Sequence, residues 1–148
     1  MIDIVFNKER FKDTFEEAIP LVRAHYDEIA HFKDIPLDPD VAMYKALEDA
    51  GVIHVFTVRK NGNLIGYSLF FVRPNPHYKS SLQAVQDVIF IDKSHRGVGG
   101  RFISWCDEQL KSIGAQVVYH HVKAAHNFGR ALERQGYVLI DLIYGKAL

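Results

Sequence analysis

The sequence of 148 residues has a single cysteine, no excess of either charge and no long apolar run. One cysteine, Cys106, excludes an internal disulfide and is typical of a reducing cytoplasm. Eighteen basic residues balance eighteen acidic ones, which argues against nucleic acid as a partner, because such proteins usually carry a basic excess. No segment approaches the roughly 18 consecutive apolar residues of a membrane span, and the N-terminus lacks a signal-peptide layout. We therefore expect a cytoplasmic protein that binds neither nucleic acid nor membrane.

Apolar residues are nevertheless abundant, since 48% of the sequence is hydrophobic and includes ten phenylalanines and seven tyrosines. A chain of this composition can bury a substantial core, so disorder is not expected. Domains typically contain about 100–200 residues, and no repeat or low-complexity segment divides the chain. We expect one domain spanning residues 1–148.

Hydrophobic periodicity predicts short strands and amphipathic helices. Asn61-Gly62 between two apolar runs favours a tight hairpin, and residues 82–92, apolar on both faces, indicate a central strand covered on both sides. Residues 31–40 and 73–81 lack a period and are expected to be loops. The predicted strands are 2–6, 52–60, 64–72, 82–92, 116–122 and 137–148, and the predicted helices are about 8–25 (capped by Asn7), 38–51, 102–113 and 126–135. The order βααβββαβαβ indicates an α/β (α+β) fold, a mixed sheet with helices on both faces.

A glycine-rich turn, Arg96-Gly97-Val98-Gly99-Gly100, lies between the central strand and the next helix. A helix N-terminus presents unpaired amides and a partial positive charge, and glycine permits close approach and positive φ, so this turn could hold a phosphate group. A tight turn that uses glycine for steric reasons alone is the alternative. A nucleoside-triphosphate loop would need Gly-Lys-Ser/Thr, and the dinucleotide fingerprint would need glycine or alanine where Phe102 stands.

The turn and the order of elements resemble the GNAT superfamily of acyl-CoA-dependent N-acetyltransferases, over nearly the whole chain. The family signature after the fourth strand is Gln/Arg-x-x-Gly-x-Gly/Ala. Arg96 and Gly99 match its first two required positions, whereas Arg101 stands at its last. The resemblance implies a mostly antiparallel central sheet and an N-acetyltransferase activity.

A second family feature is an asparagine that opens the following helix, with a Gly-aromatic pair after it. Asn127 and Gly136-Tyr137 resemble it, although the helix between them is about one turn shorter. The tyrosine that the family often has on this helix would fall at Leu132. Residues 126–137 and the Tyr144-x-Lys ending are similar to compact GNAT-like proteins of bacteriophages.

The resemblance implies acetyl-CoA as the co-substrate. In the family, the amides of the turn hold the CoA diphosphate, the end of the preceding strand pairs with the pantetheine arm, and the asparagine helix flanks that arm. Arg101 could fold over the diphosphate or block the groove, and we favour the first. Arg130 either reaches the nucleotide phosphates or is a simple surface arginine. The residues implied for cofactor binding are Ile89, Ile91, Arg96, Gly97, Val98, Gly99, Gly100, Arg101, Asn127, Phe128 and Arg130.

Asp87 is the first candidate for the general base. Alternation places it on the same face as Val85, Ile89 and Ile91, where a buried carboxylate is costly unless it is paired or functional. Burial would raise its pKa into a useful range. The alternative is a structural Asp87 that bonds a buried tyrosine or a backbone amide, in which case His121 or a solvent relay becomes the better base.

Protonation of the leaving thiolate has several candidate donors. A thiol with a pKa near 8.5 is a fair leaving group, so a general acid is helpful and not mandatory. Water, Tyr137 or Tyr144 could replace the missing tyrosine. The candidate catalytic residues are Asp87, His121 and Tyr144.

Eight histidines raise the question of a metal site. His120 and His121 point to opposite faces of a strand, and no cysteine pair or carboxylate cluster at ligand spacing accompanies them, His126 or His95. We predict no metal. Cys106 lies on the apolar face of its helix and is expected in the core.

Three functions stay open. The first is acetyl transfer to a primary amine of a small molecule or a protein. The second is a catalytically lapsed member of the same fold that acts as a binding module, which the missing tyrosine and Arg101 favour. The third is an unrelated fold whose glycine turn is only a turn. A homodimer is also possible, because many relatives pair through their sheets.

Overall fold

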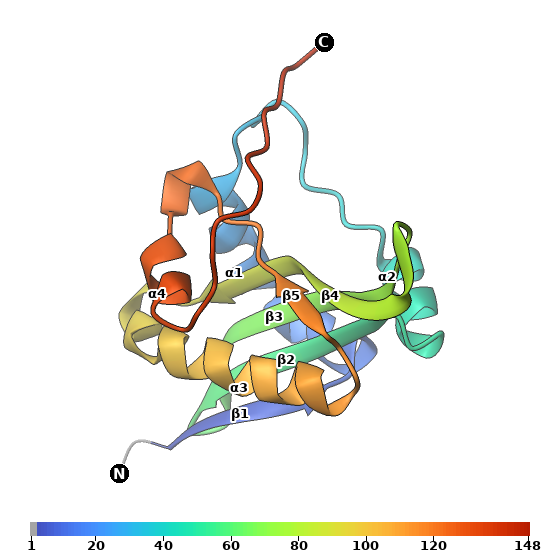
Figure 1. Ribbon diagram of the computed structural model, residues 1–148. Coiled ribbons are helices and arrows are strands. Elements are labelled where there is room, and N and C mark those ends of the chain that lie inside the picture. The colour runs from blue at the N-terminus through green and yellow to red at the C-terminus, as the bar shows by residue number, and fades with distance from the viewer. Residues whose placement is uncertain (1–2) are drawn as a thin grey trace.

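The computed structural model describes residues 3–148; Ile2, the start of the first predicted strand, lies outside the described residues. The described strands are β1 (Ile4–Glu9), β2 (Ile53–Lys60), β3 (Asn63–Asn75), β4 (Tyr78–Ile91) and β5 (Val117–Tyr119). They form one sheet in the order β1-β2-β3-β4-β5 (Figure 1). Neighbours pair antiparallel except β4 and β5, which are parallel. The predicted mixed, mostly antiparallel sheet is confirmed.

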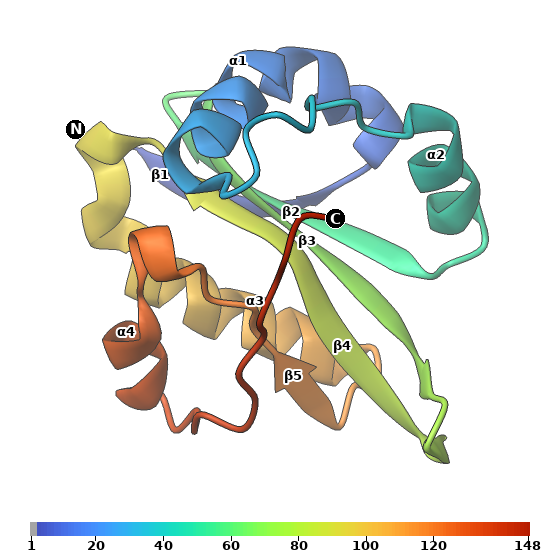
Figure 2. The ribbon, with the colours of Figure 1, turned by 90° about the horizontal axis from the view of Figure 1, so that it is seen from above.

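Helices cover both faces of this sheet (Figure 2). Those within the described residues are α1 (Phe11–Ile29), α2 (Val41–Asp49), α3 (Gly99–Ser112) and α4 (Gly129–Glu133), with 3-10 turns η1 (Lys93–Val98) and η2 (Ala124–His126). α1 and α2 lie on one face and α3 lies on the other. Across residues 3–148, no helix combines the length and the apolar character that crossing a membrane requires.

The two faces of the sheet are packed by different residues. On the α3 face, Phe102, Cys106 and Leu110 recur at helical spacing and are buried against the sheet. Burying a side chain such as Phe102 stabilises the fold by roughly 1.5–3 kcal/mol. Cys106 is a core residue, as predicted, and burial raises the pKa of its thiol to about 12. On the α1 face, Phe11 and Leu69 belong to a smaller buried cluster.

The first helix begins and ends later in the chain than its periodicity predicts. The predicted cap, Asn7, lies within β1, and α1 begins at Phe11. The Phe11 amide donates to Glu48 Oε2 of α2 at 2.7 Å, and Arg10 Nε donates to the other oxygen at 2.9 Å. A carboxylate from a distant helix therefore satisfies the N-terminus of α1, and local sequence cannot reveal such a contact.

The predicted loop at 31–40 is confirmed, whereas the loop predicted at 73–81 is wrong. β3 continues to Asn75 and β4 begins at Tyr78, so the two strands form a long hairpin whose end projects from the body (Figure 2). The Asn75 side chain accepts a hydrogen bond from the His77 amide at 2.8 Å. This local bond closes a tight turn and lets both strands extend.

The last predicted strand is also wrong. No strand forms in 137–148, a segment that the structure describes throughout. β5 spans only three residues, and the chain has left the sheet at His120, so β5 offers too short a ladder for another strand. The segment instead reaches the loop after α1, where a Cβ on Gly145 would lie 3.2 Å from the Phe32 ring. The observed order of strands and α-helices is βααβββαβα.

Candidate active site

β4 and β5 separate after a short stretch of pairing. The parallel ladder joins Gln83–Val85 to Val117–Tyr119 and ends there. Between Gln86 and Ile91, β4 still pairs with β3, but no described strand pairs with its other edge. His121, predicted within a strand, lies in irregular chain at this opening. An extended ligand could therefore bond to the backbone of β4 in the opening.

A β-bulge interrupts β4 at Asp87. In the register between β3 and β4, Leu69 lies opposite Val88 and the next residue, Phe70, lies opposite Gln86. Asp87 is the extra residue and has no opposite partner. A bulge of this kind bends the strand and redirects the side chains near it.

The bulge reverses the alternation that the sequence predicts. Val88 packs with the cluster on the α1 face, whereas Ile89 packs with the cluster on the α3 face. Asp87 reaches α2 on the α1 face, where its Oδ2 accepts a hydrogen bond from Tyr44 at 2.6 Å. The expectation that Asp87 shares a face with Ile89 and Ile91 is therefore wrong.

Asp87 is exposed, so the prediction of a buried carboxylate is wrong as well. The expected bond to a tyrosine is present, because Tyr44 donates to it. Burial, and next the carboxylate of Asp87, raise the pKa of Tyr44 and keep its hydroxyl protonated. Tyr44 thus orients Asp87 at the edge of the opening.

A cavity of about 330 Å³, here the β4 cavity, lies at this opening. Its walls come from β4, the start of α3, α1 and the segment from His121 to α4. Eight of the predicted site residues line it: Asp87, Ile89, Ile91, Arg96, Gly99, Gly100, His121 and Phe128. The other lining residues are His25, Glu28, Ile29, Gln86, Phe90, Ile103, Lys123, His126 and Ala131.

Six predicted site residues do not line the β4 cavity: Gly97, Val98, Arg101, Asn127, Arg130 and Tyr144. The Arg101 guanidinium lies 6.0 Å from the centroid of the Phe6 ring of β1, so this structure gives no support to its expected place over a diphosphate. The Asn127 side-chain oxygen Oδ1 accepts a hydrogen bond from the Gly129 amide at 2.8 Å, at the start of α4. Tyr144 is 89% exposed in the C-terminal segment.

The glycines of the turn have no steric role that the structure reveals. Among residues 3–148, positive φ occurs at other glycines and not at Gly97, Gly99 or Gly100. A Cβ on Gly97 would meet nothing within 4 Å, and the nearest atoms to one on Gly99 or Gly100 would be 3.8 and 3.6 Å away. The expected positive φ is therefore not observed. The turn is a sterically open surface at the N-terminus of α3, beside the β4 cavity.

Arg96 joins this turn to α1. Its Nε donates to the Ile91 carbonyl at 3.1 Å, and one terminal nitrogen donates to Glu28 Oε2 at 2.6 Å. The bond from Arg96 lowers the pKa of Glu28, and His126 Nδ1 lies 3.3 Å from the same carboxylate. Arg96 therefore positions the wall of the cavity.

Sequence reasoning missed His25, which lies on the buried face of α1 and lines the β4 cavity. It is 9% exposed; its Nδ1 is 3.2 Å from Tyr67 Oη, and its ring stacks on Phe90 at 4.9 Å. Burial lowers the pKa of His25 to about 4, so it is neutral at pH 7. The available signal was a histidine at helical spacing within the apolar stripe that contains Ala18 and Val22.

His120, which we do not expect to bind a metal, lies beside Gln86 of β4. Its Nδ1 is 3.0 Å from Gln86 Oε1, which favours the tautomer with the proton on Nδ1. Its Nε2 is buried without a hydrogen-bond partner among residues 3–148, and burial lowers the pKa of His120 to about 4. In the part of the chain that is described, no three His, Cys, Asp or Glu side chains group as metal ligands.

A second cavity of about 510 Å³, here the α1 cavity, lies between α1, residues 30–39 and the sheet. It shares four lining residues with the β4 cavity: His25, Ile29, Asp87 and Lys123. The two cavities therefore meet at one wall, and Asp87 lies on it.

No protein family model matches the sequence, and no curated protein matches it. Solved structures do match it over nearly its whole length. A ribosomal-protein-alanine N-acetyltransferase from Brucella melitensis biovar Abortus 2308 is 18% identical with a TM-score of 0.76, over 99% of this chain and 97% of that one.

Two further structures match as widely. An aminoglycoside acetyltransferase from an uncultured soil metagenomic sample, in complex with sisomicin, is 15% identical with a TM-score of 0.71, over 99% and 96% of the two chains. A predicted acetyltransferase with acetyl-CoA from Clostridium acetobutylicum is 11% identical with a TM-score of 0.72, over 98% and 96%. At these identities the likeness shows the fold: this chain has the fold of GNAT acetyltransferases, as predicted. A shared fold does not by itself establish a shared activity.

Proposed function

We propose that this protein transfers an acetyl group from acetyl-CoA to the nitrogen of a primary amine. The observation that carries the proposal is the open edge of β4 beside a glycine turn at a helix N-terminus. An extended arm with amide groups can pair with a free strand edge. A helix N-terminus is a ready site for a phosphate group.

The residues present fit such a ligand. Ile89 and Ile91 lie in the part of β4 that pairs with β3 on one edge and has no described strand on its other edge. Phe128 also lines the β4 cavity. The open surface at Gly99 and Gly100 leaves room for a diphosphate to approach the backbone. Of the residues first assigned to the cofactor, Arg96 would act by positioning the turn, and the roles of Arg101, Asn127 and Arg130 stay predictions.

Acetyl-CoA would supply a thioester whose carbonyl carbon bonds to the amine nitrogen as the carbon–sulfur bond breaks. An acceptor amine with a pKa near 10.4 is protonated at pH 7, and freeing it costs on the order of 4–5 kcal/mol. Asp87, oriented by Tyr44, would hold the ammonium at the shared wall and receive its proton, directly or through water. His121, which is exposed in the β4 cavity, is the second candidate.

The thiolate that leaves would take its proton from solvent. Tyr144 lies outside the β4 cavity, and the Tyr137 hydroxyl donates to Asp107 at 2.5 Å. Burial, and next that bond, raise the pKa of Tyr137. Since a thiol with a pKa near 8.5 leaves readily, a dedicated acid is not required.

A second candidate function is that of a catalytically lapsed binding module. Leu132, where the family often has a tyrosine, is buried and apolar in α4, which favours this reading. A bacteriophage origin, a cytoplasmic location, the absence of nucleic-acid and membrane partners, and a homodimer remain expectations from the sequence.

Two measurements test the proposal. Isothermal titration with acetyl-CoA should give saturable binding, and absence of binding would contradict acetyl transfer from acetyl-CoA. A thiol-release assay with a panel of primary amines should give turnover. Binding without turnover of any amine would favour the lapsed module.

A further inference from the structure

We infer that the acceptor is a primary amine with an aromatic or branched apolar group, and that this group binds in the α1 cavity. The inference rests on the proposed function, because it assumes that the amine meets the acyl donor at the shared wall. It goes further by naming the chemical class of the acceptor.

The inner end of the α1 cavity suits an ammonium group. Asp87 lines both the α1 cavity and the β4 cavity, and its carboxylate accepts a hydrogen bond from Tyr44, which also lines the α1 cavity. His25 and Lys123 lie on the same wall. Burial lowers the pKa of His25, so its ring adds no positive charge there, and among the described residues that line the α1 cavity Lys123 is the one positively charged side chain beside Asp87. An amine nitrogen at this wall would lie next to the β4 cavity.

Most of the remaining lining of the α1 cavity is apolar. Its lining includes Phe15, Val22, Ile29, Phe32 and Leu37, and its volume of about 510 Å³ falls within the roughly 300–1,000 Å³ of small-molecule sites. Burying an aryl or alkyl group against such walls contributes about 25 cal/mol per Å² of apolar surface.

Three tyrosine hydroxyls of the α1 cavity are engaged within the protein. Tyr26 donates to the Ile35 carbonyl at 2.7 Å, Tyr44 donates to Asp87 at 2.6 Å, and Tyr67 lies 3.2 Å from His25 Nδ1. A ligand with many hydroxyl groups would have to break these bonds or leave its own groups unpaired, which costs free energy.

The charged residues of the α1 cavity also favour an acceptor with a single positive charge. Apart from Asp87, the charged residues that line the α1 cavity are Asp38 and Lys123. A polyamine would bring several positive charges to a lining that has the carboxylates of Asp87 and Asp38 and the ammonium group of Lys123. One ammonium beside Asp87 and an uncharged remainder match the lining better.

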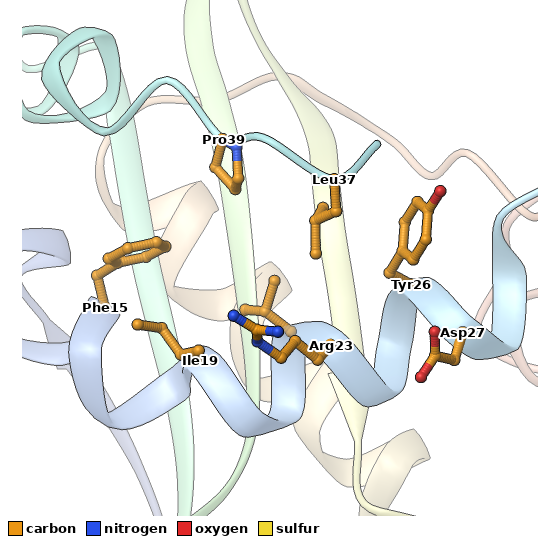
Figure 3. A pocket seen from close by; sticks show the side chains of 8 residues that line it. Phe15, Ile19, Arg23, Tyr26, Asp27, Leu37 and Pro39 are labelled. Carbon is orange, nitrogen blue, oxygen red and sulfur yellow. The ribbon is translucent and has the colours of Figure 1, made fainter. Parts of the chain in front are cut away.

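The loop 30–39 closes the α1 cavity from outside. Figure 3 shows Leu37 and Pro39 of this loop on the side that faces Phe15 and Tyr26 of α1. These four residues also line an outer cavity of about 410 Å³, which Arg23 helps to form. The space for an apolar group therefore continues between the loop and α1.

The test compares amines that differ in their apolar group. 2-Phenylethylamine should be acetylated with a kcat/KM at least about tenfold above that of ethylamine, and spermidine and kanamycin should be poor acceptors. NMR titration of the labelled protein with 2-phenylethylamine should shift the amides of Phe15, Val22 and Leu37.

A matched pair of variants locates the effect. Leu37 and Met43 are both 41% exposed, but only Leu37 lines the α1 cavity. Leu37→Asp should lower kcat/KM for 2-phenylethylamine about tenfold with little change for ethylamine and none in acetyl-CoA affinity. Met43→Asp should leave all three unchanged.

The outcomes separate this inference from the proposed function. Preference for ethylamine or polyamines, or a Leu37→Asp variant that behaves like Met43→Asp, would overturn the inference while acetyl transfer stands. Shifts of the cavity amides by 2-phenylethylamine in a protein that does not bind acetyl-CoA would support the apolar amine site and contradict the proposed function.

Discussion

The two faces of the sheet are filled in different ways. On the α3 face, Phe70, Phe102 and Leu110 are 0% exposed and close the space between helix and sheet. On the α1 face, the cavity of about 510 Å³ remains between α1 and the strands, and His25, Thr14 and Asp87 lie along it. The α3 face is therefore closely packed, whereas the α1 face has a smaller buried cluster and leaves a cavity of the size of small-molecule sites.

The largest expected effect tests this comparison through stability. Phe102→Ala should destabilise the protein by about 3–5 kcal/mol, because a fully buried ring leaves a void in a packed core. Phe15→Ala, beside the α1 cavity, should cost less than about 2 kcal/mol, because its ring already borders open space. Urea unfolding would measure both, and equal losses would contradict the difference between the faces.

A second prediction concerns the two buried histidines. Burial lowers the pKa of His25 and of His120 to about 4, against about 6.5 in the unfolded chain. Between these values the unfolded state binds more protons, so the free energy of unfolding should fall as the pH drops from about 6.5 to about 4. The loss should be on the order of 3 kcal/mol for each histidine.

The matched variants for this prediction are His25→Gln and His120→Gln. Each variant should reduce the fall in the free energy of unfolding between about pH 6.5 and about pH 4, whatever its effect on stability at pH 7. Urea unfolding at several pH values between 4 and 7 provides the measurement. If the free energy of unfolding of a variant changes with pH as steeply as that of the unmodified protein, the replaced histidine is not held neutral in the fold.

Some of this architecture could be predicted from the sequence, because it depends on local patterns. The apolar spacing of α3, the Asn61-Gly62 hairpin and the doubly covered β4 all follow from neighbouring residues. The glycine turn and the end of β4 were assigned to the site through the resemblance to the GNAT superfamily, and most of these residues line the β4 cavity.

The features that could not be predicted depend on pairing between distant segments. The bulge at Asp87 exists only in the register with β3, and it moved the carboxylate to the other face and to the surface. The C-terminal segment has strand-like composition, but a three-residue β5 gives it no ladder. His25 was missed because a histidine in an apolar stripe is more often a core residue.

A third prediction concerns Asp87, which lines both the α1 cavity and the β4 cavity. Asp87→Asn keeps the shape and removes the basicity, so kcat for an amine acceptor should fall about a hundredfold, within the range for loss of a general base. The pH–rate profile should change as well. Tyr44→Phe, which removes only the hydroxyl that orients Asp87, should lower kcat severalfold. If neither variant alters the profile, Asp87 is structural and His121 becomes the base to test.

The most direct test of the account is the binding of acetyl-CoA to a pair of variants of α3, measured by isothermal titration calorimetry. Gly99→Asp places a carboxylate on the open surface of the turn, whereas Ser104→Asp adds the same charge to an exposed position further along α3. The account predicts that Gly99→Asp weakens binding at least about tenfold, or about 1.4 kcal/mol, while Ser104→Asp binds like the unmodified protein. Unchanged affinity in a folded Gly99→Asp variant would contradict a diphosphate site at this turn.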